Sequence, residues 1–403
     1  MHKIINDPVY GFIQITDNSI YELMNHPWMQ RLRRIKQMGI AHYVYPGAVH
    51  TRFHHSLGAT HLMRQALEHL QTKKIEITPE EFLGAQQAIL LHDIGHGPFS
   101  HALEHTIVSN ISHEDISTLL MQQINTQTEG SLNTAISIFN QSHPKHFLHQ
   151  LVSSQLDMDR MDYLNRDSFY TGVSEGVIGY DRILQMLTVH NDQLSVEAKG
   201  IHSVEKFIIA RRMMYWQVYL HKTVLGVEQL IIKILKRAKA LALKGIELFA
   251  APAFKFFLYE EISKSDFESN KTLIEKFCQL DDADISSAIK VWAEHEDLIL
   301  STLCKMILNR KLYKVVLSNE KVDEAFDLLQ KNFEFPKGIN EEDKSYFLFK
   351  GSTTNKTYNQ YDDLITIQMK DGSIKNITEV DNALINPMVT LPIKKYYYCH
   401  IRL

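Results

Sequence analysis

The stretch LLHDIGHGPFSH, residues 90–101, places three histidines and one aspartate in twelve positions at the end of an apolar run. His96 lies one helical turn after His92 and therefore shares its face of a helix. Neighbouring helical residues diverge by about 100°, so His92 and Asp93 can reach one metal only where a helix widens or ends. The glycines on either side of His96 predict such an end. The stretch is therefore either an ordinary histidine-rich helix end or half of a site.

Two further segments concentrate the same chemistry on predicted helices. HTRFHHSLGATHL, residues 50–62, carries His54, His55 and His61. QLDMDRMDYLNRD, residues 155–167, is rich in aspartate, which taken alone is also typical of a solvated acidic stripe. Together the three segments offer a histidine, a His-Asp pair and an aspartate, a ligand set that suits a divalent transition metal. We expect a divalent cofactor, Mn²⁺, Fe²⁺, Mg²⁺ or Zn²⁺. The aspartates of the second segment are Asp157, Asp159, Asp162 and Asp167.

Composition limits the class of protein. The chain has 403 residues, more than one hydrophobic core usually serves, and a net charge of −4, so it carries no bulk basic field for nucleic acid. Its three cysteines are far apart and form no CxxC pair, which fits a reducing compartment. The N-terminus has no apolar signal region, and no stretch is apolar enough to span a membrane. We expect a cytoplasmic protein with no membrane partner.

Periodicity predicts a mainly α fold. KIINDPVYGFIQI, residues 3–15, and TVHNDQLSVE, residues 188–197, are typical of β-hairpins. TPEEF at 78–82 is a helix start. We expect an HD-type catalytic domain with an N-terminal hairpin at 1–245, a long helical extension at 246–335 and a small strand-containing α/β region at 336–403. Helical spacing runs through 18–38, 53–72, 79–94, 113–125, 157–169 and 202–243.

The ordered set RFHHSLG, LLHDIGHGPFSH and LDMDRMDYLNRD resembles the HD-domain metal phosphohydrolases. The opening, INDPVYGFIQI followed by QRLRRIKQMGIAHYVYPGAVHTRFHHSLG, is similar to the branch that contains the SAM-and-HD-domain deoxynucleoside triphosphate triphosphohydrolase. The resemblance runs from about residue 3 to about residue 240, and we expect a protein of this branch without the SAM domain. It implies hydrolysis of a dNTP to deoxynucleoside and triphosphate, broad in base.

The resemblance also implies roles for individual residues. The implied metal ligands are His55, His92, Asp93 and Asp159. Catalytic or phosphate-side roles fall on Arg52, His96, His101, Glu104 and His113, with His101 beside the scissile phosphate and Glu104 supporting it. Substrate contacts fall on Gln37, Met38, Arg160, Tyr163, Asp167, Arg211 and Tyr219.

Departures from the family pattern put three roles in doubt. Arg160 stands where the family has a lysine. The positive charge is kept, but a planar guanidinium with several N–H donors replaces a single ammonium group. Glu104 stands for an aspartate, one methylene shorter. The resemblance also implies a homotetramer with a regulatory nucleotide site between its subunits. Lys3, Gln30 and Arg33 match the residues of the family at that site. Asn25 replaces an aspartate that reads guanine, so strict guanine choice should be lost. Arg33 and Gln30 could equally pack at an interface.

Two other functions stay open. A nucleotidase or phosphodiesterase acting on another phosphate ester would use the same metal core. A sensing module for nucleotides or single-stranded nucleic acid would draw on the basic segment QRLRRIKQ, residues 30–37, whose ordinary interpretation is a solvated or subunit-facing helix side. An intact ligand set favours an enzyme over a sensing module.

Overall fold

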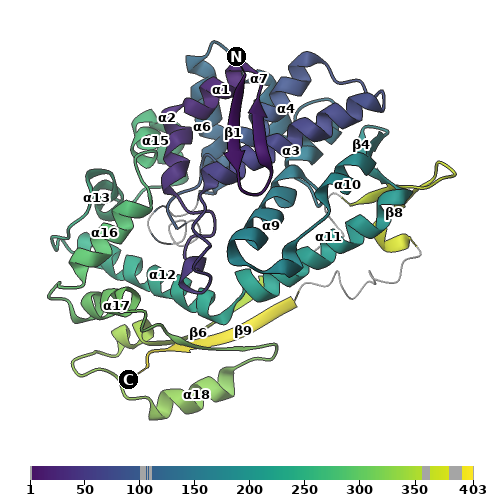
Figure 1. Ribbon diagram of the computed structural model, residues 1–403. Coiled ribbons are helices and arrows are strands. Elements are labelled where there is room, and N and C mark those ends of the chain that lie inside the picture. Colours follow the sequence, from purple (N-terminus) through teal and green to yellow (C-terminus); the bar gives the residue numbers. More distant parts are fainter. Residues whose placement is uncertain are drawn as a thin grey trace.

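The computed structural model describes residues 2–99, 106, 108, 111–355, 364–380 and 393–402. Figure 1 shows a mainly helical molecule with small sheets, which confirms the predicted fold class. The N-terminal hairpin pairs β1 (Lys3–Asp7) with β2 (Gly11–Ile15) in antiparallel register. The predicted helix over 18–38 is broken: Pro27 begins a second helix, and His26 before it is non-helical. The two helices are α1 (Asn18–Asn25) and α2 (Pro27–Arg31).

Three helices form the centre of the molecule. α3 (Arg52–Thr72) packs against both α4 (Pro79–Leu91) and α9 (Met158–Thr171). Thr78 caps α4 as predicted, because its side chain accepts the N–H of Glu81. The elements between α4 and α11 are α6 (His113–Gln127), α7 (Asn133–Phe139), α8 (His146–Val152), α10 (Tyr180–Met186), β3 (Leu187–His190) and β4 (Gln193–Glu197).

The predicted continuous helix over 202–243 is wrong in one respect. α11 (Ile201–Met214) passes into a π-helical segment, Tyr215–Tyr219, and α12 (Lys222–Leu243) begins afresh with His221 as its cap. No glycine or proline marks this break in the sequence. Such π-helical turns occur often at functional sites, and this one carries two tyrosines that line the cavity described below.

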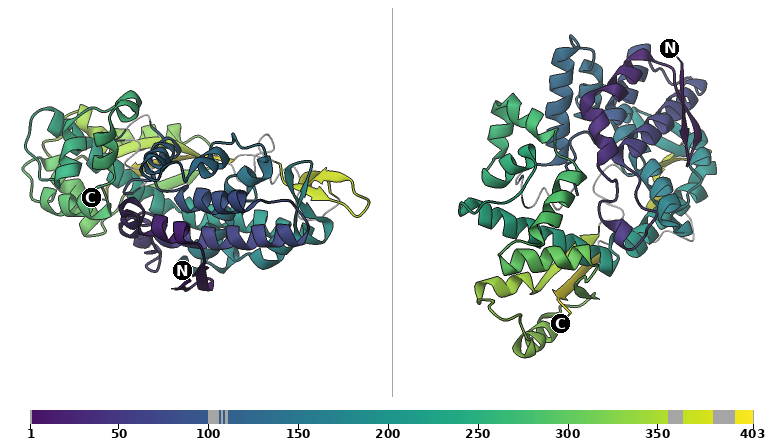
Figure 2. Two further views of the ribbon diagram at one scale, coloured as in Figure 1. Left: turned by 90° about the horizontal axis from the view of Figure 1, so that it is seen from above. Right: turned by 60° about the vertical axis from the view of Figure 1, so that its left-hand side comes forward.

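The C-terminal half adds a helical layer, a three-stranded sheet, and two strands that extend the sheet begun by β3 and β4. Figure 2 shows the β7–β8 hairpin projecting from the helical body. β9 lies between β5 and β6, and β7 pairs in parallel with β4, so segments on both sides of residue 336 share sheets. The division into three domains stays a prediction. The elements are α13 (Pro252–Tyr259), α14 (Lys264–Ser269), α15 (Lys271–Phe277), α16 (Asp282–Trp292), α17 (Leu298–Leu308), β5 (Lys314–Ser318), α18 (Asp323–Asn332), β6 (Leu348–Asn355), β7 (Thr366–Gln368), β8 (Ile374–Asn376) and β9 (Ile393–His400).

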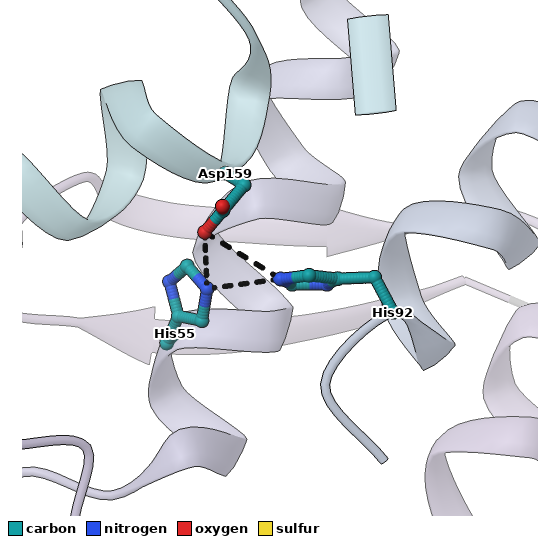
Figure 3. Close-up of side chains that lie close together, drawn as sticks. All are labelled: His55, His92 and Asp159. Carbon is teal, nitrogen blue, oxygen red and sulfur yellow. Dashed lines mark hydrogen bonds and ion pairs between the residues drawn. The ribbon is translucent and has the colours of Figure 1, made fainter. Parts of the chain in front are cut away.

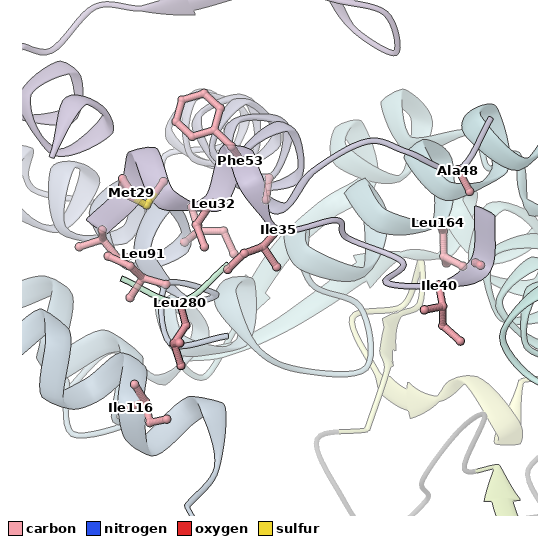
Figure 4. Packing of buried hydrophobic residues seen from close by; sticks show 14 of the residues in the cluster. Met29, Leu32, Ile35, Ile40, Ala48, Phe53, Leu91, Ile116, Leu164 and Leu280 are labelled. Carbon is pink, nitrogen blue, oxygen red and sulfur yellow. The ribbon is translucent and has the colours of Figure 1, made fainter. Parts of the chain in front are cut away.

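One hydrophobic core joins the first half to the helical extension. Figure 4 shows Leu280 of the extension among core residues from the first half of the chain, including Leu91 and Ile116. Across this junction lies Arg31, which is fully buried. Its guanidinium donates to the carbonyls of Ile94 (2.8 Å) and His96 (2.9 Å) in the loop after α4. It also donates to two carbonyls of the extension, those of Phe277 and Leu280.

We predict that Arg31→Ala lowers the free energy of unfolding by at least about 2 kcal/mol, because it leaves buried carbonyls without a donor. Urea denaturation followed by circular dichroism measures the change. Arg33→Ala is the matched control, since Arg33 is exposed in the same segment. Equal stability of the Arg31 and Arg33 variants would show that the buried hydrogen bonds do not hold the junction.

Candidate metal centre and substrate cavity

Three predicted metal ligands converge at the junction of α3, α4 and α9. The Nε2 atoms of His55 and His92 lie 3.3 Å apart, and Asp159 Oδ1 lies 3.0 Å from the first and 3.5 Å from the second (Figure 3). Asp93 stands beside them: its Oδ1 is 3.4 Å from His92 Nε2, and its Oδ2 is 3.8 Å from His55 Nε2. His55, His92 and Asp159 therefore face one point, and Asp93 lies at the edge of that group.

Neighbouring groups fix which ring nitrogens carry hydrogen. His92 Nδ1 lies 2.7 Å from the carbonyl oxygen of Ile89, which can only accept, so Nδ1 donates. His55 Nδ1 lies 2.7 Å from Asp162 Oδ2 and donates in the same way. In the neutral rings both Nε2 atoms then present lone pairs to each other and to two carboxylates. Such a set of acceptors requires a cation between them.

The donor set fits a divalent transition metal. Nitrogen and oxygen ligands at about 2.1 Å from one ion lie about 3.0 to 3.4 Å from each other. The separations among His55, His92 and Asp159 are 3.0 to 3.5 Å, which is close to that range. Without a metal, burial lowers the pKa of His55, but hydrogen bonds to Asp159 and Asp162 outweigh it and raise the pKa to about 10. A proton thus takes the place of the cation, which is the expected behaviour of a metal site.

A cavity of about 730 Å³ opens from the metal ligands. This volume is within the range of ligand pockets. All the predicted substrate residues line it, from four separate parts of the chain. They are Gln37, Met38, Arg160, Tyr163, Asp167, Arg211 and Tyr219.

A hydrogen-bonded group stands on one wall of the cavity. Asp167 is buried, and its carboxylate accepts from the Tyr219 hydroxyl (2.7 Å) and contacts His50 Nε2 (2.8 Å). The His50 ring stacks on Tyr170, with centroids 4.4 Å apart. Burial and the negative charge of Asp167 raise the pKa of Tyr219, so the tyrosine stays a neutral donor. This group holds the Tyr219 ring at a fixed place in the cavity.

Three arginines supply positive charge to the cavity, and each already has a partner. Arg52 Nη1 contacts Asp93 Oδ2 at 2.5 Å. Arg211 donates to Gln155 (3.1 Å), and Arg160 lies 3.4 Å from Asp157. These partners hold the guanidinium groups in place, and a phosphate chain entering the cavity meets cations that are already oriented.

The structure describes two of the three predicted catalytic histidines. His96 and His113 both line the cavity and stack with centroids 3.8 Å apart. Burial and the charge of Arg52 lower the pKa of His96 to about 3, so this ring is neutral at pH 7. His101 and Glu104, the predicted proton donor and its support, lie outside the described residues.

The four predicted regulatory residues lie outside this cavity. Lys3 is exposed at the start of β1, and Asn25 is exposed at the end of α1, where its amide donates to Tyr21 O (2.8 Å). Gln30 accepts from Arg33 Nε (2.8 Å) and donates to Met24 O (2.8 Å). The Arg33 guanidinium also lies over the Phe53 ring, 3.7 Å from its centroid. Gln30 and Arg33 thus already contact each other within one chain.

The structure gives contacts at the site to residues for which the sequence analysis assigned no role. His50 and Asp162 stand within the quoted clusters, and their spacing from the predicted ligands was the available signal. Tyr215, Glu228 and Thr353 line the cavity from the π-helical segment, α12 and β6. No motif marks these three, because only the tertiary fold brings β6 against α12.

Comparisons with known proteins agree with this geometry. A model of the HD domain matches residues 52–167, and a model of an HD associated region matches residues 178–248. An uncharacterized protein of Bacillus subtilis, YwfO, is 35% identical over 89% of this chain and 81% of its own length. A deoxynucleoside triphosphate triphosphohydrolase SAMHD1 homolog of Dictyostelium discoideum is 32% identical over 57% of this chain and 48% of its own length.

Solved structures share the whole fold. The crystal structure of a phosphohydrolase from Bacteroides thetaiotaomicron is 51% identical with a TM-score of 0.93, covering 100% of both chains. A hypothetical protein from Aquifex aeolicus is 27% identical with a TM-score of 0.75, covering 100% of this chain and 97% of that one.

Among the residues that the structure describes, no helix is both long and apolar enough to cross a membrane.

We predict that the double variant His92→Ala, Asp93→Ala loses bound metal and all turnover while the fold largely survives. The reason is that both residues stand just after α4, and this helix packs through other buried apolar residues such as Ala88, Ile89 and Leu90. Metal content by mass spectrometry and helix content by circular dichroism check the two parts. A double variant that retains stoichiometric metal would show that the ligands lie elsewhere.

Proposed function

This chain belongs to the HD-domain family, and from that membership and the cavity we propose that it is a metal-dependent deoxynucleoside triphosphate triphosphohydrolase. The reaction would convert a dNTP and water into a deoxynucleoside and triphosphate. The dNTPase relatives support this choice, although this chain covers only about half of their length. The observation that carries it is the Tyr219–Asp167 pair, because it stands in one cavity with the metal ligands and three arginines.

The residues divide the work by charge. Arg52, Arg160 and Arg211 would bind the polyphosphate, which needs several cations at once. A divalent ion held by His55, His92, Asp93 and Asp159 would neutralise phosphate charge and activate water. Asp167 and Tyr219, held by each other, would bind the sugar.

Proton transfer falls to the histidine side of the cavity. The predicted His101, supported by Glu104, would protonate the leaving 5′-oxygen, since an imidazole of ordinary pKa can donate near pH 7. His96 would remain neutral in this arrangement, and with His113 it would contact the phosphate edge through ring nitrogens.

The same metal centre would serve a nucleotidase or a phosphodiesterase, so the reaction products must distinguish these activities from a dNTP triphosphohydrolase. The assay incubates the protein with Mn²⁺ and either a dNTP, a dNMP or single-stranded DNA, and separates products by ion-exchange chromatography. Triphosphate released from dNTPs alone supports the proposal. Stepwise phosphate release or cleavage of DNA would replace it with one of the alternatives, and absence of any turnover would favour a sensing module.

Ribonucleotides should be poor substrates. If the Tyr219 ring packs under the sugar, a 2′-hydroxyl is buried without a partner, which costs roughly 1–3 kcal/mol, or about 5- to 150-fold in kcat/KM. The measurement compares dATP with ATP. We expect Tyr219→Ala to narrow the gap and Tyr219→Phe, which keeps the ring, to preserve it. Equal efficiency on ATP and dATP in the unmodified protein would contradict the packing.

For assembly, we propose a homotetramer whose regulatory dNTP site at the subunit interface is either absent or not specific for guanine. Asn25 has one carbonyl acceptor where a carboxylate would offer two oxygens to guanine, and its amide can face adenine instead. The exposed Lys3 and Arg33 would stand with Asn25 in the base-reading part of that site. Gln30 would stay against Arg33.

We predict that hydrolysis of a fixed substrate is activated either by no added dNTP or by several to a similar extent, and that Asn25→Asp shifts any activation towards dGTP. Rates with each added dNTP test the first part, and light-scattering mass tests the tetramer. Activation by dGTP alone would refute the Asn25 argument, and a monomer under all conditions would remove the assembly.

A further inference from the structure

A series of buried ion pairs extends from the far side of His55 to the N-terminal hairpin. The Nε2 atom of His55 faces the metal point, while its Nδ1 donates to Asp162 Oδ2 at 2.7 Å. Arg166, one turn further along α9, donates from Nε to Asp162 Oδ2 (2.9 Å) and from Nη2 to Oδ1 (3.0 Å). Both carboxylate oxygens of Asp162 are therefore held by one guanidinium.

The other edge of the same guanidinium binds the hairpin. Arg166 Nη1 donates to Asp7 Oδ2 (2.8 Å) and Nη2 to Asp7 Oδ1 (3.3 Å). Asp162 and Arg166 are fully buried, and Asp7 is 7% exposed. Asp7 Oδ1 also accepts the N–H groups of Val9 and Tyr10, so one carboxylate closes the hairpin turn and pairs with Arg166.

The packing of α3 against this network depends on the absence of a side chain at Gly58. A Cβ atom on Gly58 would lie 1.9 Å from Asp162 Oδ1 and 2.2 Å from Arg166 Nη2. Gly58 stands one turn after His55 on the same helix. Any larger residue there would push the Asp162 carboxylate and the guanidinium out of their present places.

We propose that Asp7 and Arg166 are positioning residues of the metal centre, acting on His55 through Asp162, so that the N-terminal hairpin is part of the metal site. A carboxylate behind a ligating histidine fixes its tautomer and ring orientation, and such partners govern metal affinity. Here the Asp162 carboxylate is itself held by the Arg166 guanidinium. The second partner of that guanidinium, Asp7, is more than 150 residues away from Arg166 in the chain. The inference rests on the metal site of the proposed function and not on its substrate.

The ordinary alternative is that the network only stabilises the fold. Asp7→Asn separates the two, because the amide keeps an oxygen for the Val9 and Tyr10 N–H groups but gives up the charge that pairs with Arg166. Gly58→Ala is the second variant, since it displaces the network from the other side without removing any of its members. We expect either variant to weaken Mn²⁺ binding about tenfold, at the lower end of what outer partners of metal ligands contribute.

Two control variants introduce the same kinds of change, a lost carboxylate charge and an added Cβ atom, at places away from the metal centre. Asp297 also accepts a backbone N–H, from Leu300, and pairs bidentately with an arginine, Arg237, so Asp297→Asn matches Asp7→Asn. Gly84 is a helical glycine of α4 where a Cβ would lie 2.7 Å from Thr134 Cγ2, so Gly84→Ala matches Gly58→Ala. Both controls should lose stability and keep Mn²⁺ affinity.

The readout is the Mn²⁺ dissociation constant by isothermal titration calorimetry without nucleotide, at a temperature where circular dichroism shows each variant folded. Weakened binding in Asp7→Asn or Gly58→Ala, with unchanged binding in the controls, is the expected result. If one of the two variants fails to fold, the other decides. Unchanged affinity in a folded variant, or an equal loss in the controls, overturns the proposal. A protein that binds Mn²⁺ but does not hydrolyse dNTPs would refute the proposed function alone.

Discussion

Two imidazole nitrogens and one carboxylate that face one point, with a second carboxylate beside them, cannot satisfy each other without a cation, and the packing of three helices brings them there. Each ligand comes from a different part of the chain: His55 from α3, His92 and Asp93 from the end of α4, and Asp159 from the first turn of α9. To bring them within about 3 to 4 Å, α4 and α9 must both pack on α3. The apolar faces of the three helices supply the free energy that holds the acceptors together against their repulsion.

Sequence reasoning succeeded where chemistry and local geometry coincide. The His92-Asp93 pair followed by glycines predicts a helix end, and α4 does end at Leu91. Thr78 with Pro79 predicts a cap that the structure contains. The seven substrate residues were assigned by resemblance, and all of them line one cavity.

Sequence reasoning failed where only long-range contacts decide. The segment Tyr215–Tyr219 has helical spacing and no helix breaker, so nothing local marks its change to π-helical geometry. Asp7 has the sequence of an ordinary Asp-Pro turn, and its ion pair with Arg166 becomes visible only after α9 is placed beside the hairpin. Thr353 belongs to a predicted strand, but its place in the cavity depends on the packing of β6 near α12. Periodicity determines which face of an element is buried, and it does not determine which distant element covers that face.

Asp93 lies between the candidate metal ligands and Arg52, the arginine proposed to bind phosphate. Its Oδ2 contacts Arg52, while its Oδ1 lies near His92 and 3.3 Å from His96. One carboxylate can therefore serve a metal through Oδ1 and hold a guanidinium through Oδ2 at the same time. Because Arg52 and His55 stand one turn apart on α3, a shift of this helix would move the cation for the phosphate and the ligand for the metal together. The packing of α3 thus sets both the position of the Arg52 guanidinium, which would receive the substrate, and the geometry of the metal site. A change in this packing would alter both.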